Sequence, residues 1–313
     1  DGPAIVEDEE DRLPDTKTAE LLKYHHRFGH VPFARLQKMA EKNIIPRRLR
    51  NCNVPVCSAC LYAKATKRPW RPKTRKNETT KTQPLKPGDC VSVDQLVSPT
   101  PGLIAQLAGR PTIKRYKYAT VFVDQASKLG FVHLQKSSDA EETLEAKAAF
   151  EEFCRIRGVT IRANHADNGI FRAHKWVQSC KETRQALTFA GVNAHHSNGL
   201  AEKRIRDLQD MARTMLIHGN KRWPKAVTAQ LWPYALRMAN DVLNNTPSLQ
   251  DKQSREPINI FSDTGTSIHP KHWKPFGCPI YCLEDNLQQN KPHHKWKTRS
   301  RVGIYLGRSP SHA

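Results

Sequence analysis

Residues 195–216 read HHSNGLAEKRIRDLQDMARTML, and the rest of the chain is organised around this stretch. It opens with the turn-like Ser197-Asn198-Gly199, and apolar residues then recur every three or four positions, which predicts an α-helix with one buried face. The apolar positions are Ile205, Leu208, Met211, Ala212, Met215 and Leu216. Glu202 lies on the first turn outside that face, and Arg206 and Arg213 follow it along one edge. The pattern predicts a carboxylate at the start of a helix, with basic groups behind it.

A carboxylate in a first helical turn is ordinarily explained by the helix dipole, but two upstream aspartates suggest a second role. Asp167 follows the strand-like residues 159–162 and begins Asp-Asn-Gly, which alone indicates a turn. Asp94 lies inside another strand-like segment, residues 90–96, although Asp is depleted from strands. Carboxylates at a strand, a strand end and a helix start can hold two divalent metals, which activate the attacking oxygen and stabilise the leaving oxygen in phosphoryl transfer.

The order Asp94, then Asp167-Asn168-Gly169, then NGLAEK at residues 198–203 resembles the Asp, Asp, Glu triad of retroviral-type integrases. It most resembles the integrase segment of copia-type LTR retrotransposon polyproteins, over roughly residues 21–307. The resemblance implies that Asp94, Asp167 and Glu202 are catalytic and bind Mg²⁺ or Mn²⁺.

Two features of the sequence bear on this assignment. Asp124, within Val-Asp-Gln, competes with Asp94 for the first metal position, and the family's placement of its first ligand on the first strand favours Asp94. After Gly169 the chain continues with Ile170-Phe171, which makes this segment one or two residues shorter than the family pattern.

A second constellation lies upstream, where His25-x4-His30 is followed after 26 residues by Cys57-x2-Cys60. Tetrahedral zinc takes this mixture of nitrogen and sulfur ligands, and a segment of about 45 residues with few large apolar side chains gains folding energy from a metal. The segment is similar to the His-His-Cys-Cys domain that precedes the catalytic domain in this family. His26 is an alternative to His25, which the family spacing favours, and Cys52 is a spare thiol nearby.

Composition points to a polyanionic partner. The 313 residues include 51 Lys and Arg against 30 Asp and Glu, a formal net charge of +21, for which nucleic acid is the default explanation. Eight cysteines with one tight pair do not form a secreted disulfide scaffold, and no apolar run approaches the length of a membrane span. We expect double-stranded DNA as partner, no membrane association, a homo-oligomer assembled on DNA, and a fragment of a longer polypeptide.

Basic residues are expected to contact DNA in two places. Residues 62–81 hold eight Lys or Arg against one Glu, either as a solvated linker or as a sequence-blind contact to phosphates. Beside the predicted metals, basic and amide side chains would contact or position the DNA backbone. The predicted DNA-binding residues are Arg68, Arg71, Arg75, Asn198, Lys203, Arg206 and Arg213.

The order of predicted elements is that of a ribonuclease H-like α/β fold with a mixed sheet. Strands are expected at 90–96, 118–124 and 129–135, the last two antiparallel, then a helix from a Ser138-x-x-Glu141 capping box to about Arg155. A strand at 159–163, a helix near 174–184, a short strand near 187–190 and the Glu202 helix follow. The predicted domains are a disordered connector (1–17), a zinc-binding domain (18–62), a basic linker (63–84), the catalytic core (85–250, with a helix at 227–243) and a basic β module (251–313, with strands near 276–281 and 301–307).

The leading hypothesis is an integrase that joins element DNA 3′ ends to target DNA, acting in the nucleus after assembly in cytoplasmic particles. The alternative is a catalytically decayed element fragment that only binds zinc and nucleic acid. A ribonuclease on the same fold is a further alternative, against which the upstream zinc-binding segment argues.

Overall fold

The structure, a computed structural model, describes residues 16–66, 85–104, 113–190, 198–263 and 269–309. Its centre is a five-stranded sheet of β1 (Val91–Gly102), β2 (Tyr116–Asp124), β3 (Gly130–Gln135), β4 (Ala163–Ala166) and β5 (Ala186–Phe189). The strand order is β3-β2-β1-β4-β5; β1, β2 and β3 are antiparallel neighbours, whereas β4 and β5 run parallel to β1. This mixed order confirms the predicted ribonuclease H-like class.

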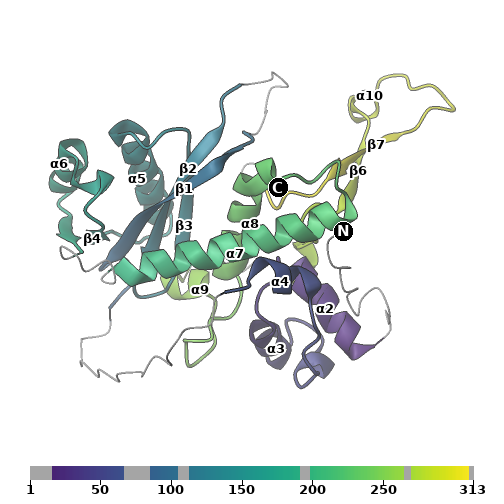
Figure 1. Cartoon of the computed structure of the whole chain (residues 1–313), viewed down its shortest axis with the longest axis horizontal. Coiled ribbons are helices and arrows are strands. Elements are labelled where there is room, and N and C mark those ends of the chain that lie inside the picture. Colours follow the sequence, from purple (N-terminus) through teal and green to yellow (C-terminus); the bar gives the residue numbers. More distant parts are fainter. Residues whose placement is uncertain (1–15, 67–84, 105–112, 191–197, 264–268, 310–313) are drawn as a thin grey trace.

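Helices cover both faces of the sheet (Figure 1). On one face α5 (Ala140–Arg155) and α6 (His174–Glu182) pack against Val91, Val93 and Phe122. On the other face α7 (Gly199–Arg222) and α8 (Trp232–Asn244) pack against Leu96 and its neighbours. Successive strand residues point to opposite faces, so Asp94, one residue after Val93, belongs to the face that α7 covers.

The helix ahead of β4 and β4 itself differ in detail from the prediction. The capping residue of α5 is Asp139, whose side chain accepts the backbone N–H of Glu142, so the predicted Ser138–Glu141 capping box is wrong by one residue. The strand predicted at 159–163 is also wrong, because β4 begins at Ala163. The preceding β-branched residues 159–161 have the higher strand propensity. Residues 163–166 nevertheless form the strand, because they are the ones that pair with β1 on one side and β5 on the other.

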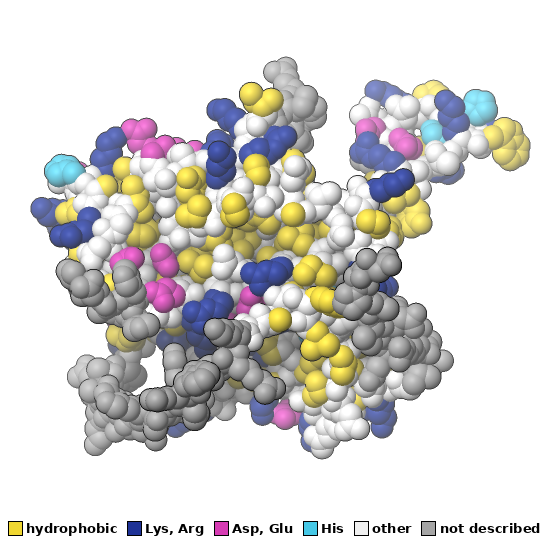
Figure 2. Space-filling model, viewed as in Figure 1, with side chains coloured by type: hydrophobic (Ala, Val, Ile, Leu, Met, Phe, Trp, Pro, Cys, Tyr) yellow, Lys and Arg dark blue, Asp and Glu magenta, His cyan; other side chains and the backbone are white. Residues whose placement is uncertain are grey.

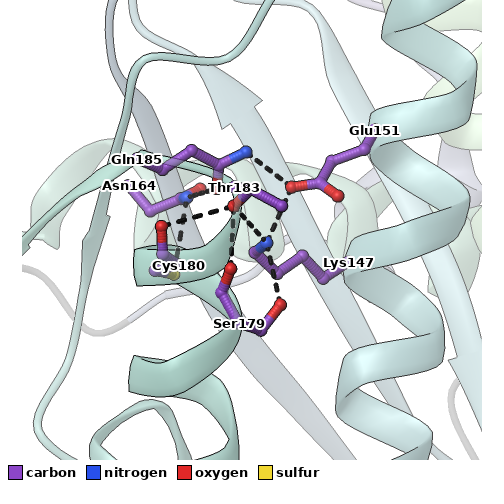
Figure 3. A network of polar contacts seen from close by, with 7 residues as sticks. All are labelled: Lys147, Glu151, Asn164, Ser179, Cys180, Thr183 and Gln185. Atoms are coloured by element: carbon purple, nitrogen blue, oxygen red, sulfur yellow. Dashed lines mark hydrogen bonds and ion pairs between the residues drawn. The ribbon is translucent and has the colours of Figure 1, made fainter.

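A polar network joins α5 to α6 and to the edge of the sheet (Figure 3). The ammonium of the buried Lys147 donates to Glu151 at 2.7 Å and to the hydroxyls of Ser179 (3.1 Å) and Thr183 (3.2 Å). Gln185 in turn donates to the same Glu151 oxygen at 2.6 Å. The network satisfies a charge that would be costly to bury alone.

The amino-terminal helices share a hydrophobic core with the long helix α7. They are α2 (Lys17–Arg27), α3 (Phe33–Glu41), η1 (Arg47–Leu49) and α4 (Ser58–Ala63), and they lie below the carboxyl-terminal half of α7 in Figure 1. Phe28 and Leu36 belong to the same buried cluster as Met211 and Met215 of α7. The His–Cys segment therefore packs directly on a helix of the sheet domain.

Short elements complete the chain. The helix predicted at 227–243 begins later, since η4 (Ala229–Leu231) precedes α8. Helix α9 (Pro257–Phe261) adds Ile258 and Phe261 to the buried cluster of α5 and α6. After the turn η5 (Pro270–His272), β6 (Pro279–Leu283) and β7 (Ser300–Ile304) form a hairpin that extends from the body in Figure 1, and α10 (Asp285–Gln288) lies between these two strands in the chain. The turn η2 (Ile170–Arg172) links β4 to α6. None of the helices in the described ranges is long and apolar enough to cross a bilayer. The proposed domain boundaries stay predictions.

Candidate active site and metal centre

Strand register brings the two predicted aspartates together. β1 and β4 are parallel neighbours, with Ser92 opposite His165 and Val93 opposite Ala166. The next positions along both strands are Asp94 and Asp167, so the two carboxylates leave adjacent strands at the same level.

The third carboxylate is held nearby by the start of α7. Asn198, the residue before the helix, donates its side-chain amide to the carbonyl of Val93 at 3.0 Å. This bond fixes the first turn of α7, which carries Glu202, beside the strand position of Asp94. Figure 2 shows acidic side chains gathered on this face near the beginning of α7.

The pKa of Asp94 also indicates that Asp167 and Glu202 lie close to it. Burial is the main cause that raises the pKa of Asp94, and the charges of Asp167 and Glu202 raise it further, while the backbone N–H of Gln95 opposes the shift. No described Lys or Arg forms an ion pair with any of the three carboxylates. Their oxygens do not all approach within 4.8 Å, the spacing that the His–Cys cluster reaches. Carboxylate oxygens are hard ligands of the kind that divalent cations such as Mg²⁺ prefer.

Asp124, the alternative to Asp94, has a structural role instead. Its carboxylate is fully buried and accepts hydrogen bonds from the backbone N–H groups of Gly88 (2.9 Å) and Ser127 (2.7 Å) and from the Ser127 hydroxyl (2.6 Å). These donors satisfy the carboxylate within the turns around β2, which leaves it unsuited to a metal at the α7 end of the sheet.

The four predicted zinc ligands form a compact cluster. Ligand atoms of His25, His30, Cys57 and Cys60 all lie within 4.8 Å of one another. His25 Nε2 is 3.2 Å from Cys60 Sγ and 3.2 Å from His30 Nδ1, and His30 Nδ1 is 3.5 Å from Cys57 Sγ and 3.7 Å from Cys60 Sγ. Zinc at its usual bond lengths makes tetrahedron edges of roughly 3.3–3.8 Å, so the donor set fits this ion.

Protonation in the cluster also suits a metal. Burial lowers the pKa of His25 and lowers that of His30 well below its usual range, so both rings are neutral and have a lone pair to offer. The neighbouring Cys57 and then His25 lower the pKa of the Cys60 thiol to about 4 against the opposing effect of burial, which favours the thiolate.

The geometry favours His25 over His26 as the first ligand. His25 Nδ1 is 2.9 Å from the Val31 carbonyl, and a proton held there leaves Nε2 free to face the thiols. His26 Nε2 is 3.7 Å from Cys57 Sγ, and the ring belongs to a second histidine group with His30 and His218.

The predicted DNA contacts fall into three groups. Lys203 and Arg206 are exposed on α7, beside the acidic group. Arg213 is exposed but already uses its Nη1 to donate to the Ala63 carbonyl (2.8 Å) and to Asp210 (2.9 Å). Asn198 is 1% exposed and its amide ties α7 to β1, and its contact to DNA stays a prediction. Arg68, Arg71 and Arg75 lie outside the described residues.

Two further residues of α7 were not anticipated. Arg204 is buried, and its Nη2 donates to Asn240 at 2.8 Å and Asn244 at 2.7 Å. In the sequence Arg204 is one of three basic residues that closely follow Glu202. Only the helical periodicity could have indicated that Arg204, unlike Lys203 and Arg206, is buried. His218 is also buried and lies three residues after Met215, on the predicted apolar face.

Comparisons with known proteins find one domain family and relatives among retrotransposon polyproteins. Residues 10–65 match the GAG-pre-integrase domain. The chain is 25% identical over 275 residues to the retrovirus-related Pol polyprotein from transposon TNT 1-94 of Nicotiana tabacum, covering 86% of this chain. It is 24% identical over 297 residues to that from transposon RE2 of Arabidopsis thaliana, covering 91% of this chain. The chain resembles the integrase region of copia-type retrotransposon polyproteins. This integrase-like chain spans 18% of the length of each of these polyproteins.

Solved structures that match this chain include retroviral integrases. The catalytic core domain of HTLV-2 integrase in complex with magnesium matches with a TM-score of 0.39 and 17% identity, over 56% of this chain and 98% of that one. A chain of the simian T-cell lymphotropic virus intasome in complex with PP2A regulatory subunit B56 gamma matches with a TM-score of 0.42 and 15% identity, over 70% of this chain and 68% of that one.

Proposed function

We propose that this chain is a metal-dependent polynucleotidyl transferase that joins 3′ ends of element DNA to target DNA in the nucleus. The similarity to integrase regions supports the reaction class, and the three carboxylates supply the chemistry. The excess of basic residues supports DNA as the partner, and we expect two or more copies of the chain to assemble on it.

Asp94, Asp167 and Glu202 would hold two Mg²⁺ or Mn²⁺ ions. When bound, such ions would activate the attacking oxygen and stabilise the leaving oxygen of an in-line displacement at phosphorus. Bound cations would also remove the mutual repulsion that, together with burial, raises the pKa of Asp94.

Other residues of the chain would position the reactants. The exposed Lys203 and Arg206 would contact phosphates beside the carboxylates, and Asn198 would keep Glu202 at its place by anchoring the start of α7. A 3′-hydroxyl of element DNA would attack a target phosphodiester, so that one phosphodiester bond forms as another breaks. Water in place of the hydroxyl would give end processing.

The register of β1 and β4 is the observation on which the proposal chiefly rests. It places Asp94 and Asp167 on neighbouring strands at the same level, where the helix that carries Glu202 also begins. Asp124 shows how buried hydrogen-bond donors can explain a single carboxylate. The convergence of Asp94, Asp167 and Glu202, with no ion pair to a Lys or Arg in the described part of the chain, is what supports a shared metal-binding role.

The test is transfer of a short duplex with element-type ends into a plasmid, with Mg²⁺ or Mn²⁺. We expect Glu202→Gln to lower the yield of joined product by at least about a hundredfold, because the amide cannot hold a metal as the carboxylate does. DNA binding should persist. Asp207→Asn, on the same helix, is the matched control and should join DNA like the unmodified chain.

Two results would contradict the proposal. Equal product from Glu202→Gln and the unmodified chain would mean that the triad is wrongly assigned. No product from either, with salt-sensitive DNA binding intact, would favour the alternative of a decayed element fragment, for which the short Ile170-Phe171 segment after Gly169 is the specific sequence feature.

A further inference from the structure

The second ring nitrogen of His30 meets a histidine from the other end of the chain. His30 Nε2 is 3.1 Å from Nδ1 of His218, which lies on α7 sixteen residues after Glu202. The two rings are 4.9 Å apart between centroids and nearly perpendicular, at 85°. Both side chains are buried, with 1% and 6% of their surface exposed, so the contact is shielded from water.

The opposite nitrogen of His30 belongs to the predicted zinc site. His30 Nδ1 lies among His25 Nε2 and the two thiols, at 3.2–3.7 Å. A neutral imidazole whose Nδ1 lone pair binds a metal carries its proton on Nε2. That N–H then points at Nδ1 of His218, which accepts the hydrogen bond.

Each histidine of the cluster is therefore oriented by one partner. For His25 the partner is the backbone carbonyl of Val31, six residues away and within the same segment. For His30 it is His218, 188 residues away on a helix of the sheet domain. Partners of this kind fix the tautomer and the direction of a metal-binding ring.

The backbone of the turn before α3 brings His30 close to α7, where it contacts His218. Gly29 and His30 both have left-handed backbone conformations, with φ of 57° and 60°. A side chain on Gly29 would have its Cβ only 2.9 Å from Met215 Sδ of α7, so the turn presses against the helix one turn before His218. A non-glycine residue in this conformation is uncommon and costs free energy, which packing against α7 offsets.

We propose that His218 is a positioning residue for zinc, which orients His30 and thereby ties the metal site to the helix that carries Glu202. This inference rests on His25, His30, Cys57 and Cys60 as the zinc ligands and does not depend on DNA joining. Loss of His218 should weaken the metal site although His218 itself does not bind the ion.

The test is metal binding by the full chain, measured with Co²⁺ spectra and with competition for Zn²⁺ against a chromophoric chelator. The unmodified chain should show tetrahedral ligand-field bands and thiolate-to-cobalt charge-transfer bands. His218→Leu, which removes the acceptor, should lower Zn²⁺ affinity by about 10–100-fold and shift the ligand-field bands, while both thiolates remain bound. His218→Gln retains an acceptor oxygen and should restore most of the affinity.

The matched control is His174→Leu, at an exposed position at the start of α6, which should bind metal as the unmodified chain does. Folding is checked by circular dichroism, and if His218→Leu does not fold, His218→Gln against His218→Ala gives the same comparison.

Three outcomes would overturn the inference or its basis. Identical affinity and spectra for His218→Leu and the unmodified chain would exclude the positioning role. Cobalt binding that lacks thiolate bands yet requires His218 would assign the ion to the neighbouring group of His26, His30 and His218 instead. Absence of metal binding by the unmodified chain would reject the zinc site of His25, His30, Cys57 and Cys60 itself.

Discussion

At the scale of single residues, the chain holds charged side chains in unusual places beside its candidate site. Arg204, two residues after Glu202, is buried, and burial lowers the pKa of its guanidinium to about 9. It forms no ion pair with any described carboxylate and donates instead to the side chains of Asn240 and Asn244. Both asparagines also donate to the carbonyl of Gly130, so one residue joins α7, α8 and β3.

Removing Arg204 should therefore affect both stability and the position of Glu202. Arg204→Ala leaves the Asn240 oxygen without its donor and opens a cavity, and we expect a loss of about 2–4 kcal/mol in the free energy of unfolding. Denaturant unfolding measures the loss, and DNA joining should fall in conditions where the variant is still folded. Lys203→Ala, at the exposed neighbouring position, should be as stable as the unmodified chain. An unchanged free energy of unfolding for Arg204→Ala would mean that its buried contacts do not stabilise the fold.

Asp241 gives a prediction about pH. Burial raises the pKa of its carboxyl to about 6, against the smaller opposing effects of Arg308 and Arg237. The folded chain thus keeps this proton to a higher pH than the unfolded chain, whose carboxyl has an ordinary pKa of 3.8, so this group lowers stability as the pH rises from about 4 to about 6.

Asp241→Asn should remove that dependence. We expect the variant to be more stable than the unmodified chain above pH 6, by about 1–2 kcal/mol, and to lose the advantage near pH 4. Thermal unfolding across this range measures the difference. The exposed Asp263→Asn should show no such trend, and a constant difference at all pH values would reject the explanation.

At the scale of elements, the sequence predicted most of the order and missed details that pairing decides. Strong periodicity located α7 and the three antiparallel strands, and the spacing of His and Cys indicated the four residues that the structure brings together as a candidate zinc site. The position of β4 was missed because Ala163, Asn164 and His165 have no strand propensity and are selected only by pairing with β1 and β5. Helical periodicity could have indicated that Arg204 and His218 are buried, but not which residues they contact, because their partners lie 36 and 188 residues away.

The network between α5 and α6 can be tested on its own. Lys147→Ala leaves Glu151 without its cation and two hydroxyls without their donor, so we expect a loss of about 2–3 kcal/mol in the free energy of unfolding. Chemical denaturation measures it. Lys175→Ala, whose exposed ion pair with Glu141 is of the kind that contributes little, is the matched control. Equal effects of the two substitutions would mean that the buried network has no special weight.

At the scale of the whole molecule, the net charge of +21 predicts strongly salt-dependent DNA binding. A plot of the logarithm of the DNA-binding constant against the logarithm of the salt concentration should be a falling straight line. Each neutralised phosphate should contribute about 0.9 to the steepness of this line. Lys203→Ala and Arg206→Ala should each lower the slope by about 1 without changing sequence preference. Lys181→Ala, on α6 across the sheet, should leave the slope unchanged, and an unchanged slope in all three would place the DNA elsewhere.

The long helix α7 has a consequence for how the sequence can change. Its 24 residues span about 36 Å, and Glu202 and His218 are separated along it by about 24 Å and by a rotation of about 160°. Substitution of an exposed residue between them alters neither value, whereas insertion or deletion of one residue turns one site about 100° away from its partners. The number of residues between Glu202 and His218 thus fixes both their separation and their relative orientation on the helix. Related chains that keep both residues are therefore expected to vary at the exposed positions between them and not in the number of residues.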